Sequence, residues 1–482
     1  MFMRRSWAVV LLLLLPRVAW AEEIGAPQAV PEGDAPSIER AEEAPLEPAS
    51  EDGEIAPKED PSAADITEVG SRWTRLLRME ATSLTLLPRR GAREDEGFVQ
   101  LEPTVRMAKR GTFRLNLGAP VRLRLWGGGE DAGPVRKEDW DTLSDWGQVV
   151  RLLTVGGDAP NFLWVGALES YTLLSGHLVR RYNNRGNPDY HPAGAVATGR
   201  LGPVYAEAFA SDVRGARLAG AEVSLDVQHV LFGRPRQSSR YTLALSAVHD
   251  WGRAGGASEP LTLAHLDGTA ILVRSRREDR DFELHGVGGW GGRPGEGGAW
   301  GAVAGVGVES VSSTMDLRAR LEGRMQRGGF RQGTFGPDYE LARFQVAGPV
   351  SVPLADVPFP KGYSAYGEVI LSWDAERLRT LGNRHLRLTM GAEVFNWGRV
   401  DVDGRLEVQV FHRDVTVAVA GLAVGIGEPR GRYLVSGEAR WRFLGGKLYA
   451  VGQGGTLLLP TAEGTLRPGA FVAVGLGMDN VR

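Results

Sequence analysis

The chain has 482 residues, a formal net charge of −3, 65 glycines and no cysteine. The lack of cysteine excludes a disulfide framework, a lipid-modified cysteine and thiol chemistry. No stretch reaches the ~20 consecutive apolar residues that a membrane-spanning helix requires, so any crossing of a membrane must be made by strands.

Residues 1–21 have the three parts of an export signal. Arg4 and Arg5 form the basic start, Trp7 to Leu15 form a short apolar core, and Ala19-Trp20-Ala21 is a small-x-small cleavage site. We therefore predict a signal peptide that is removed after Ala21.

Residues 22–70 have a different composition from the rest of the chain. Pro, Ala and Glu dominate, and residues 22–65 carry 14 acidic side chains against Arg40 and Lys58, a net charge of −12. Such a segment cannot bury enough apolar surface to offset its ordering entropy. It is predicted to be a disordered periplasmic linker, either a plain spacer or a tether that binds a basic periplasmic protein or peptidoglycan-associated machinery.

Residues 71–482 read as one long series of strands in which apolar and polar side chains alternate. In STMDLRARLEGRM, Met315, Leu317, Ala319 and Leu321 alternate with a charged phase. Period two predicts strands with one apolar and one wet face. The same alternation occurs in TFRLNLGAPVRLRLW, AEVSLDVQHVLF, SAYGEVILSWD, HLRLTMGAEVF, GRLEVQVF and GEARWRFLGG.

Most of these strands are about 9 to 13 residues long, which suits a tilted membrane-spanning strand and exceeds the usual strand of a soluble sandwich. No fixed repeat favours a propeller or solenoid. Aromatic residues lie near the expected strand ends, namely Trp126, Trp251, Trp290, Tyr363, Trp397 and Trp441. We predict an all-β fold, a transmembrane antiparallel β-barrel of about 18 strands with polar residues inside. The alternative is a large soluble sheet.

One segment, KEDWDTLSDWGQVVRLLTVGG, departs from the strand pattern. Asp141 or Ser144 is placed to cap a short helix that ends near Gly156. Long insertions in barrels often fold into the lumen. The segment is either an ordinary amphipathic helix on a loop or a constriction element, with Asp139, Asp141 and Asp145 facing an Arg-rich wall.

The tract from Phe162 to Asn184, FLWVGALESYTLLSGHLVRRYNN, reads as a hairpin followed by a polar loop. Through Gly176-His177 and Tyr182-Asn183-Asn184 it resembles a tract of poorly characterised outer-membrane barrels of spirochaetes and myxobacteria. That resemblance covers about a tenth of the chain and implies an outer-membrane, porin-like barrel without implying an activity.

Arginine dominates the polar phase of the predicted strands. Rings of Arg favour the passage of anions, whereas acidic residues on the same faces would make the charges a structural ion-pair network. The pore-lining candidates are Arg114, Arg122, Arg124, Arg318, Arg320, Arg324, Arg387, Arg440 and Arg442.

The sequence contains no arrangement typical of catalysis, so we predict that the protein is not an enzyme. The eight His are scattered, and HxH and HExxH motifs are absent, so no metal site and no cofactor are predicted. Asp401 to Gly404, DVDG, reads as a tight turn between strands. No nucleic-acid partner is expected.

We therefore predict an outer-membrane channel for the passage or export of hydrophilic, anionic solutes or polysaccharide. Its partners would be outer-membrane lipid, the machinery that inserts barrels, and a periplasmic partner of residues 22–65. The alternative is a structural barrel that anchors an envelope-spanning assembly such as gliding-motility machinery.

Overall fold

The computed structural model describes residues 74–88, 95–109, 112–127, 133–156, 160–233, 240–252, 260–277, 279–295, 297–344, 360–374, 385–411, 414–429, 431–460 and 466–479. The predicted signal peptide and acidic linker lie outside these residues. Among the described helices, none has the length and apolar character needed to span a bilayer.

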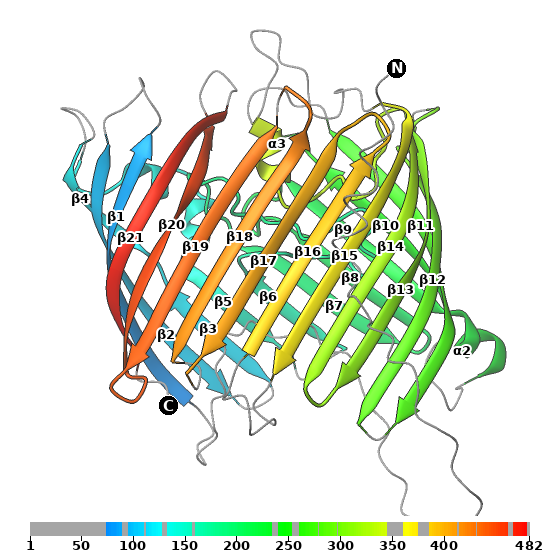
Figure 1. Ribbon diagram of the computed structural model, residues 1–482, viewed down its shortest axis with the longest axis horizontal. Helices are drawn as coiled ribbons and strands as arrows, with labels where there is room; N and C mark the ends of the chain where they lie inside the picture. The colour runs from blue at the N-terminus through cyan, green and yellow to red at the C-terminus, as the bar shows by residue number, and fades with distance from the viewer. Residues whose placement is uncertain are drawn as a thin grey trace, which may run out of the picture. The chain divides into compact units, whose positions relative to one another are not determined.

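Twenty-one strands form one antiparallel sheet that closes on itself (Figure 1). The first eleven are β1 (Thr74–Pro88), β2 (Glu96–Lys109), β3 (Phe113–Gly118), β4 (Val121–Trp126), β5 (Val150–Val155), β6 (Phe162–Gly166), β7 (Gly194–Leu201), β8 (Val204–Ala210), β9 (Leu218–Asp226), β10 (Tyr241–Asp250) and β11 (Leu261–Arg277). The others are β12 (Arg280–Gly292), β13 (Trp300–Ser312), β14 (Met315–Arg327), β15 (Gly362–Asp374), β16 (His385–Phe395), β17 (Val400–Val410), β18 (Val415–Ile426), β19 (Arg432–Phe443), β20 (Leu448–Pro460) and β21 (Leu466–Asp479).

The sheet closes where β21 pairs with β1, from Arg78 opposite Asp479 to Pro88 opposite Gly469. Strands β3 and β4 pair with successive parts of β2, so together they occupy the position of one barrel strand, which is interrupted at Ala119-Pro120. Counted in this way, the barrel has 20 strands around its wall, slightly more than the predicted number of about 18.

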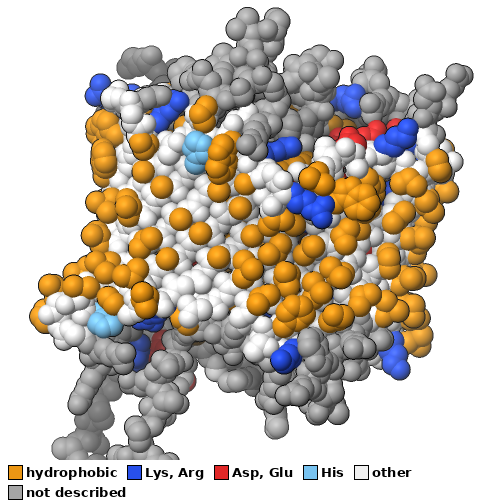
Figure 2. Space-filling model, turned by 180° about the vertical axis from the view of Figure 1, so that it is seen from behind, with side chains coloured by type: hydrophobic (Ala, Val, Ile, Leu, Met, Phe, Trp, Pro, Cys, Tyr) orange, Lys and Arg blue, Asp and Glu red, His pale blue; other side chains and the backbone are white. Residues whose placement is uncertain are grey.

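The alternation places apolar side chains on the outside of the barrel. In β14, Leu321 is 61% exposed, whereas its neighbour Glu322 is 1% exposed and faces inward. The same contrast separates Val435 and Trp441 from the charged phase of β19. Figure 2 shows apolar side chains over the band between the two rims, with nearly all charged groups toward the rims. Lipid requires this arrangement, because exposed apolar surface is stable only against hydrocarbon.

The aromatic residues predicted near strand ends lie mainly at one rim. Trp126 ends β4, Trp251 follows β10, and Tyr363 is the second residue of β15, all at the upper rim in Figure 1. Trp290 and Trp397 lie toward that rim as well, whereas Trp441 lies near the lower end of β19. This upper rim also carries the longest connections.

Two sequence interpretations of local structure are wrong. The DVDG stretch is not a turn but part of β17, and Asp401 is buried there with its side chain in ion pairs. The predicted capped helix is replaced by two 3-10 turns, η1 (Lys137–Asp139) and η2 (Asp145–Val149), and Val150 already begins β5. Two α-helices are also present, α2 (Val227–Phe232) and α3 (Tyr339–Phe344).

Candidate functional site

The connection between β6 and β7, residues 167–193, folds into the barrel and is called here the first inward segment. Tyr171 and Tyr182 pair through two backbone hydrogen bonds of 3.0 and 2.8 Å, which makes a small hairpin with Gly176 near its tip. Leu178, Val179 and Tyr182 at this hairpin are at most 1% exposed. The hairpin predicted in this tract is thus located within the polar loop itself.

The first inward segment is fixed to one side of the wall by carboxylates that point inward. The Tyr171 hydroxyl donates to Glu207 of β8 at 2.5 Å, and Ser175 donates twice to Glu222 of β9 at 3.0 Å. Farther around the barrel, Arg180 lies 3.3 Å from Glu322 of β14. Because β8, β9 and β14 are spread around the ring, the segment cannot move as a free flap.

Arg181 extends the first inward segment across to the opposite wall. Its guanidinium lies 2.7 Å from Asp403 of β17 and 3.1 Å from Glu368 of β15, and it donates to the Tyr366 hydroxyl at 3.1 Å. A Cβ atom at Gly391 of β16 would lie 2.0 Å from the Arg181 Nη2, so only glycine leaves room for this side chain.

The connection that follows β14 contains a second inward segment, residues 328–344, which ends in α3. Val179 and Phe335 join the two segments in a short parallel bridge. The Tyr182 hydroxyl donates to Glu340 of α3. Phe330, Phe335 and Tyr339 belong to a buried apolar cluster with side chains of the first segment and of β7 to β11. The two segments therefore form one packed unit.

Ion pairs attach the second inward segment at both of its ends. Arg331 lies 2.6 Å from Asp401 of β17, and Asp338 lies 2.5 Å from Arg432 of β19. At the other side, Arg343 lies 2.8 Å from Asp250 of β10. Together the two inward segments cross the lumen and form a constriction near the upper rim.

A third element, residues 133–149, lies between β4 and β5 and is called here the mouth segment. Asp139 is fully buried, 2.6 Å from both Arg122 and Arg136, and 3.5 Å from His191. Burial alone would raise the pKa of Asp139, but the hydrogen bond with His191 and the charges of Arg122 and Arg136 hold that pKa at about 2.

The two other predicted acids of the mouth segment lie in different surroundings. Asp145 is fully buried and accepts hydrogen bonds from the backbone N–H groups of Thr142 and His191, both at 3.0 Å. Asp141 is exposed, and its pKa is raised by partial burial and by the neighbouring Asp145. Arg136 also lies 2.5 Å from Asp189, which connects the mouth segment to the first inward segment.

The nine arginines proposed from the sequence as pore-lining lie on inward-facing positions but fall into three groups. Arg324 is 1% exposed and bound by Glu322 and Glu393, and Arg320 donates to the Ser175 carbonyl, so both help to hold the inward segments. Arg122 pairs with Asp139 at the mouth, and Arg124 and Arg440 pair within the wall. Arg114 also has an interaction partner. Within the described ranges, no ion pair is made by Arg318, Arg387 or Arg442.

Water contacts the inward face of β17 and β19 below the residues that anchor the two inward segments. The inward side chain of Arg405 on β17 is 53% exposed, and that of Glu438 on β19 is 37% exposed. The inward positions of β18 carry only small or apolar side chains, such as Thr416, Ala418 and Ala420, because Val417 and Val419 point outward. The wall is therefore lined here by short side chains, of which Ala418 is only 4% exposed.

The inward faces of β17–β21 and β1–β5 carry an excess of arginine and are called here the positive sector. Apart from Asp401, Asp403 and Arg432, which bind the inward segments or the adjoining turn, these faces present ten Arg and six acids, a net charge of +4 from 10 − 6. The ten are Arg78, Arg106, Arg114, Arg122, Arg124, Arg151, Arg405, Arg440, Arg442 and Arg467, and the six are Glu80, Glu96, Glu102, Glu407, Glu438 and Asp479.

The residues that form the constriction were not predicted from the sequence. Arg180 and Arg181 follow an apolar Leu178-Val179 pair, which is an unusual context for two charges and was a usable signal for burial. Residues 328–344 have neither strand nor helix period over a sufficient length. Their role follows only from partners more than 60 residues away, such as Asp401 for Arg331.

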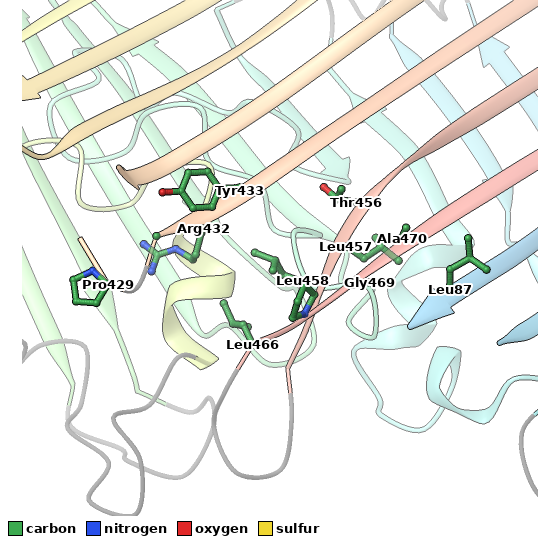
Figure 3. Close-up of a pocket in the computed structure, with 12 residues that line it drawn as sticks. Leu87, Pro429, Arg432, Tyr433, Thr456, Leu457, Leu458, Leu466, Gly469 and Ala470 are labelled. Atoms are coloured by element: carbon green, nitrogen blue, oxygen red, sulfur yellow. The ribbon is translucent and has the colours of Figure 1, made fainter. Parts of the chain in front are cut away.

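A groove of about 660 Å³ lies at the upper ends of β19–β21 and β1, next to Pro429 and Leu466 (Figure 3). Its lining is largely apolar, with Leu87, Leu457 and Leu458, and its single arginine, Arg432, is already bound by Asp338. This groove therefore offers little for recognition of a polar solute.

No protein-family model and no characterised relative matches the chain, so the likeness to spirochaete and myxobacterial barrels has no support from these comparisons. Several solved structures align with most of the chain. One is Pseudomonas aeruginosa OccK2 (OpdF), which is 11% identical in sequence; the alignment covers 85% of this chain and 98% of OccK2, with a TM-score of 0.33. A second is a BenF-like porin from Pseudomonas fluorescens, with 9% identity, coverage of 85% of this chain and 99% of the porin, and a TM-score of 0.33. A third is Pseudomonas aeruginosa OpdK with vanillate, with 8% identity, coverage of 84% of this chain and 98% of OpdK, and a TM-score of 0.35. By its own geometry, a closed antiparallel barrel with an apolar outer band and a charged interior, this chain is a porin-like β-barrel of the bacterial outer membrane.

Proposed function

We propose that this protein is a passive channel for small hydrophilic anions. The observation that carries the proposal is the positive sector, in which Arg405 of β17 and Glu438 of β19 are exposed to water in the lumen. A solute crossing the lumen passes fixed positive charges in a confined aqueous path. Such a field lowers the barrier for anions and raises it for cations.

The constriction favours small solutes over polymers. The first inward segment is fastened to β8, β9, β14, β15 and β17, and the second to β10, β17 and β19. A polysaccharide that needed the full lumen would have to break several of these buried ion pairs together. We infer that export of polysaccharide, an anchoring role and catalysis are all less compatible with this interior than passage of small anions.

The orientation of the barrel in the outer membrane follows from the lengths of the connections at its two rims. β1 begins and β21 ends at the lower rim of Figure 1, where the connections at 202–203 and 313–314 are only two residues long. Short turns of outer-membrane barrels face the periplasm. The constriction then lies toward the cell exterior, and we propose that residues 22–70 act as a spacer on the periplasmic side, where residues 22–65 are available to a basic or peptidoglycan-associated partner.

The test is the reversal potential of single channels in a planar bilayer under a KCl gradient. Wild type should prefer chloride to potassium. The double variant Arg405→Glu, Arg440→Glu changes the positive sector from +4 to 0 and should abolish most of that preference. The matched control is Arg214→Glu, Arg327→Glu, which makes the same change of net charge at two exposed positions near the upper rim.

Three outcomes oppose the proposal. A correctly inserted barrel without openings would exclude a channel, and a wild type without anion preference would exclude the electrostatic mechanism. If both double variants lose preference equally, the effect comes from overall charge and not from the lumen.

A further inference from the structure

Three side chains with the chemistry of metal ligands meet where the first inward segment touches the wall. His177 lies at the tip of the inward hairpin, and His265 and Asp267 lie two residues apart on β11, so both point into the barrel. Their exposed fractions are 0%, 1% and 2%. One ligand atom from each lies within 4.8 Å of the others.

The two imidazoles present the same nitrogen to the same carboxylate oxygen. The Nδ1 atoms of His177 and His265 both lie against Oδ1 of Asp267, at 2.9 Å in the case of His265. The rings are 4.9 Å apart and inclined by 31°. Ligands of a tetrahedral zinc ion with bonds of 2.0–2.1 Å lie about 3.4 Å from each other, so a small outward movement of these donors would admit an ion between them.

The ligand atoms of these three side chains have no hydrogen-bond partner in the described part of the chain. Both ring nitrogens of His177 and His265 and both carboxylate oxygens of Asp267 lack a hydrogen bond of ordinary geometry, although they lie within ion-pair range of each other. Leaving so many buried polar atoms without partners is costly. A bound cation would be a partner for the Nδ1 atoms of His177 and His265 and for Oδ1 of Asp267 at once.

Glycines on β12 allow His265 and Asp267 to lie close against the wall. Gly289 and Gly291 of β12 stand directly opposite Asp267 and His265 in the sheet. A Cβ atom at Gly289 would lie 2.6 Å from His265 Cε1 and 2.7 Å from Asp267 Oδ1. Phe330 of the second inward segment stacks on His265 at 6.2 Å and closes the other side.

The outer nitrogen of His177 lies within ion-pair range of a carboxylate, although the contact lacks the geometry of a hydrogen bond. Its Nε2 lies 3.4 Å from Glu322, which is held in turn by Arg324 at 2.7 Å. A slight shortening of this contact would make Glu322 accept from Nε2, which would leave Nδ1 free to bind a metal and keep the ring in place.

We propose that His177, His265 and Asp267 bind one divalent transition-metal ion of the zinc class, which fastens the first inward segment to β11. Imidazole and carboxylate donors without thiolate suit Zn²⁺ and its neighbours, and two nitrogen ligands disfavour Mg²⁺ and Ca²⁺. Since His177 is the ligand contributed by the segment, occupancy is coupled to the position of the constriction. The assignment does not depend on the solute that the channel carries.

The test is the metal content of the full exported chain, refolded into detergent after treatment with a chelator and then dialysed against Zn²⁺. Wild type should retain about one ion per chain, measured by elemental mass spectrometry. His265→Gln and Asp267→Asn should each weaken Zn²⁺ binding by more than about 100-fold, and Glu322→Gln by about 10- to 100-fold. His249→Gln, a histidine of β10 hydrogen-bonded to Thr262 at 2.8 Å, is the matched control and should bind as wild type does.

Folding of each variant is checked by its heat-modifiable migration in gels, so that loss of metal is not confused with loss of the barrel. The proposal is wrong if folded wild type retains no more Zn²⁺ than folded His265→Gln, or if Mg²⁺ competes equally. In the first case the three side chains would be an ion-pair cluster only, and in the second the site would not be of the zinc class.

Discussion

Arg181 and Asp403 are 222 residues apart in the chain and 2.7 Å apart across the lumen. This contact joins the first inward segment to β17, on the side of the barrel where the positive sector begins. It passes over Gly391, where any larger residue would occupy the position of the guanidinium. The attachment of the first inward segment to β17 therefore depends on one arginine and on the glycine that makes room for it.

Arg181→Gln should loosen the constriction without unfolding the barrel. It removes a charge that is 7% exposed from between Glu368 and Asp403 and leaves both carboxylates without this partner. Breaking a buried pair costs about 3 kcal/mol, so the segment should detach about 100-fold more often. Single-channel recordings should show larger, noisier openings. Conductance and noise equal to those of wild type would show that Arg181 does not limit the passage.

Gly391→Ala should produce the same change from the opposite wall. Its Cβ atom would lie 2.0 Å from Arg181 Nη2 and 2.5 Å from Nη1, so the guanidinium must leave its carboxylates. Gly421→Ala on β18 is the control, because a Cβ atom there meets nothing within 4 Å. The same recordings measure both variants. If Gly391→Ala behaves like Gly421→Ala, the Arg181 side chain has an alternative path to Asp403.

The wall of the barrel could be predicted from the sequence, because alternation is a local signal. The charged phase of Met315 to Arg324 predicted which side chains of β14 face inward, and the exposed Leu321 beside the buried Glu322 agrees with it. The constriction could not be predicted in this way. Whether Arg324 lines open water or is buried depends on Glu393, 69 residues away, and on a loop that has no period.

The DVDG stretch shows the limit of local turn signals. Asp-Gly is typical of tight turns, but in β17 the aspartates are retained because Asp401 binds Arg331 and Arg399 and Asp403 binds Arg181. Long-range ion pairs thus override the local preference. The proximity of His177 to His265 could not be predicted for the same reason, since the two are brought together only by the inward fold of the first segment.

The mouth segment should detach at low pH because of Asp139. Its pKa of about 2 is below the ordinary value of 3.8. A carboxyl group with a lowered pKa stabilises the folded state fully above pH 3.8, and this contribution is lost as the pH falls through about 2. The difference corresponds to about 2 kcal/mol. Pepsin, which is active in this range, can measure detachment as cleavage within residues 133–149.

Asp139→Asn supplies the comparison for the mouth segment. Above pH 4, pepsin should cleave this variant faster than wild type, and the two rates should converge as the pH approaches 2. Parallel rates over the whole range would mean that the buried contacts of Asp139 with Arg122 and Arg136 do not hold the segment.

Arg185, unlike Arg180 and Arg181 of the first inward segment, makes no ion pair among the described residues. Its Nε donates to the Pro192 carbonyl at 3.0 Å, whereas its Nη2 is buried and has no hydrogen-bond partner among the described residues. Burial and the nearby charge of Arg151 lower the pKa of Arg185 to about 10, against the opposing effect of Glu169 and Glu102. The group remains charged at neutral pH, and a bound carboxylate would supply the partner that Nη2 lacks.

Arg185→Gln should therefore weaken binding of a small carboxylate in the lumen. With acetate as the probe, the concentration that halves chloride conductance should rise about 10-fold, the effect of losing one charge-assisted hydrogen bond. Arg185→Lys, which keeps the charge, should restore part of the affinity, and Arg214→Gln on the exposed loop after β8 should have no effect. If Arg185→Gln and wild type are blocked equally, the anion passes along the positive sector without touching the first inward segment. The electrostatic selectivity would then come from the strands alone.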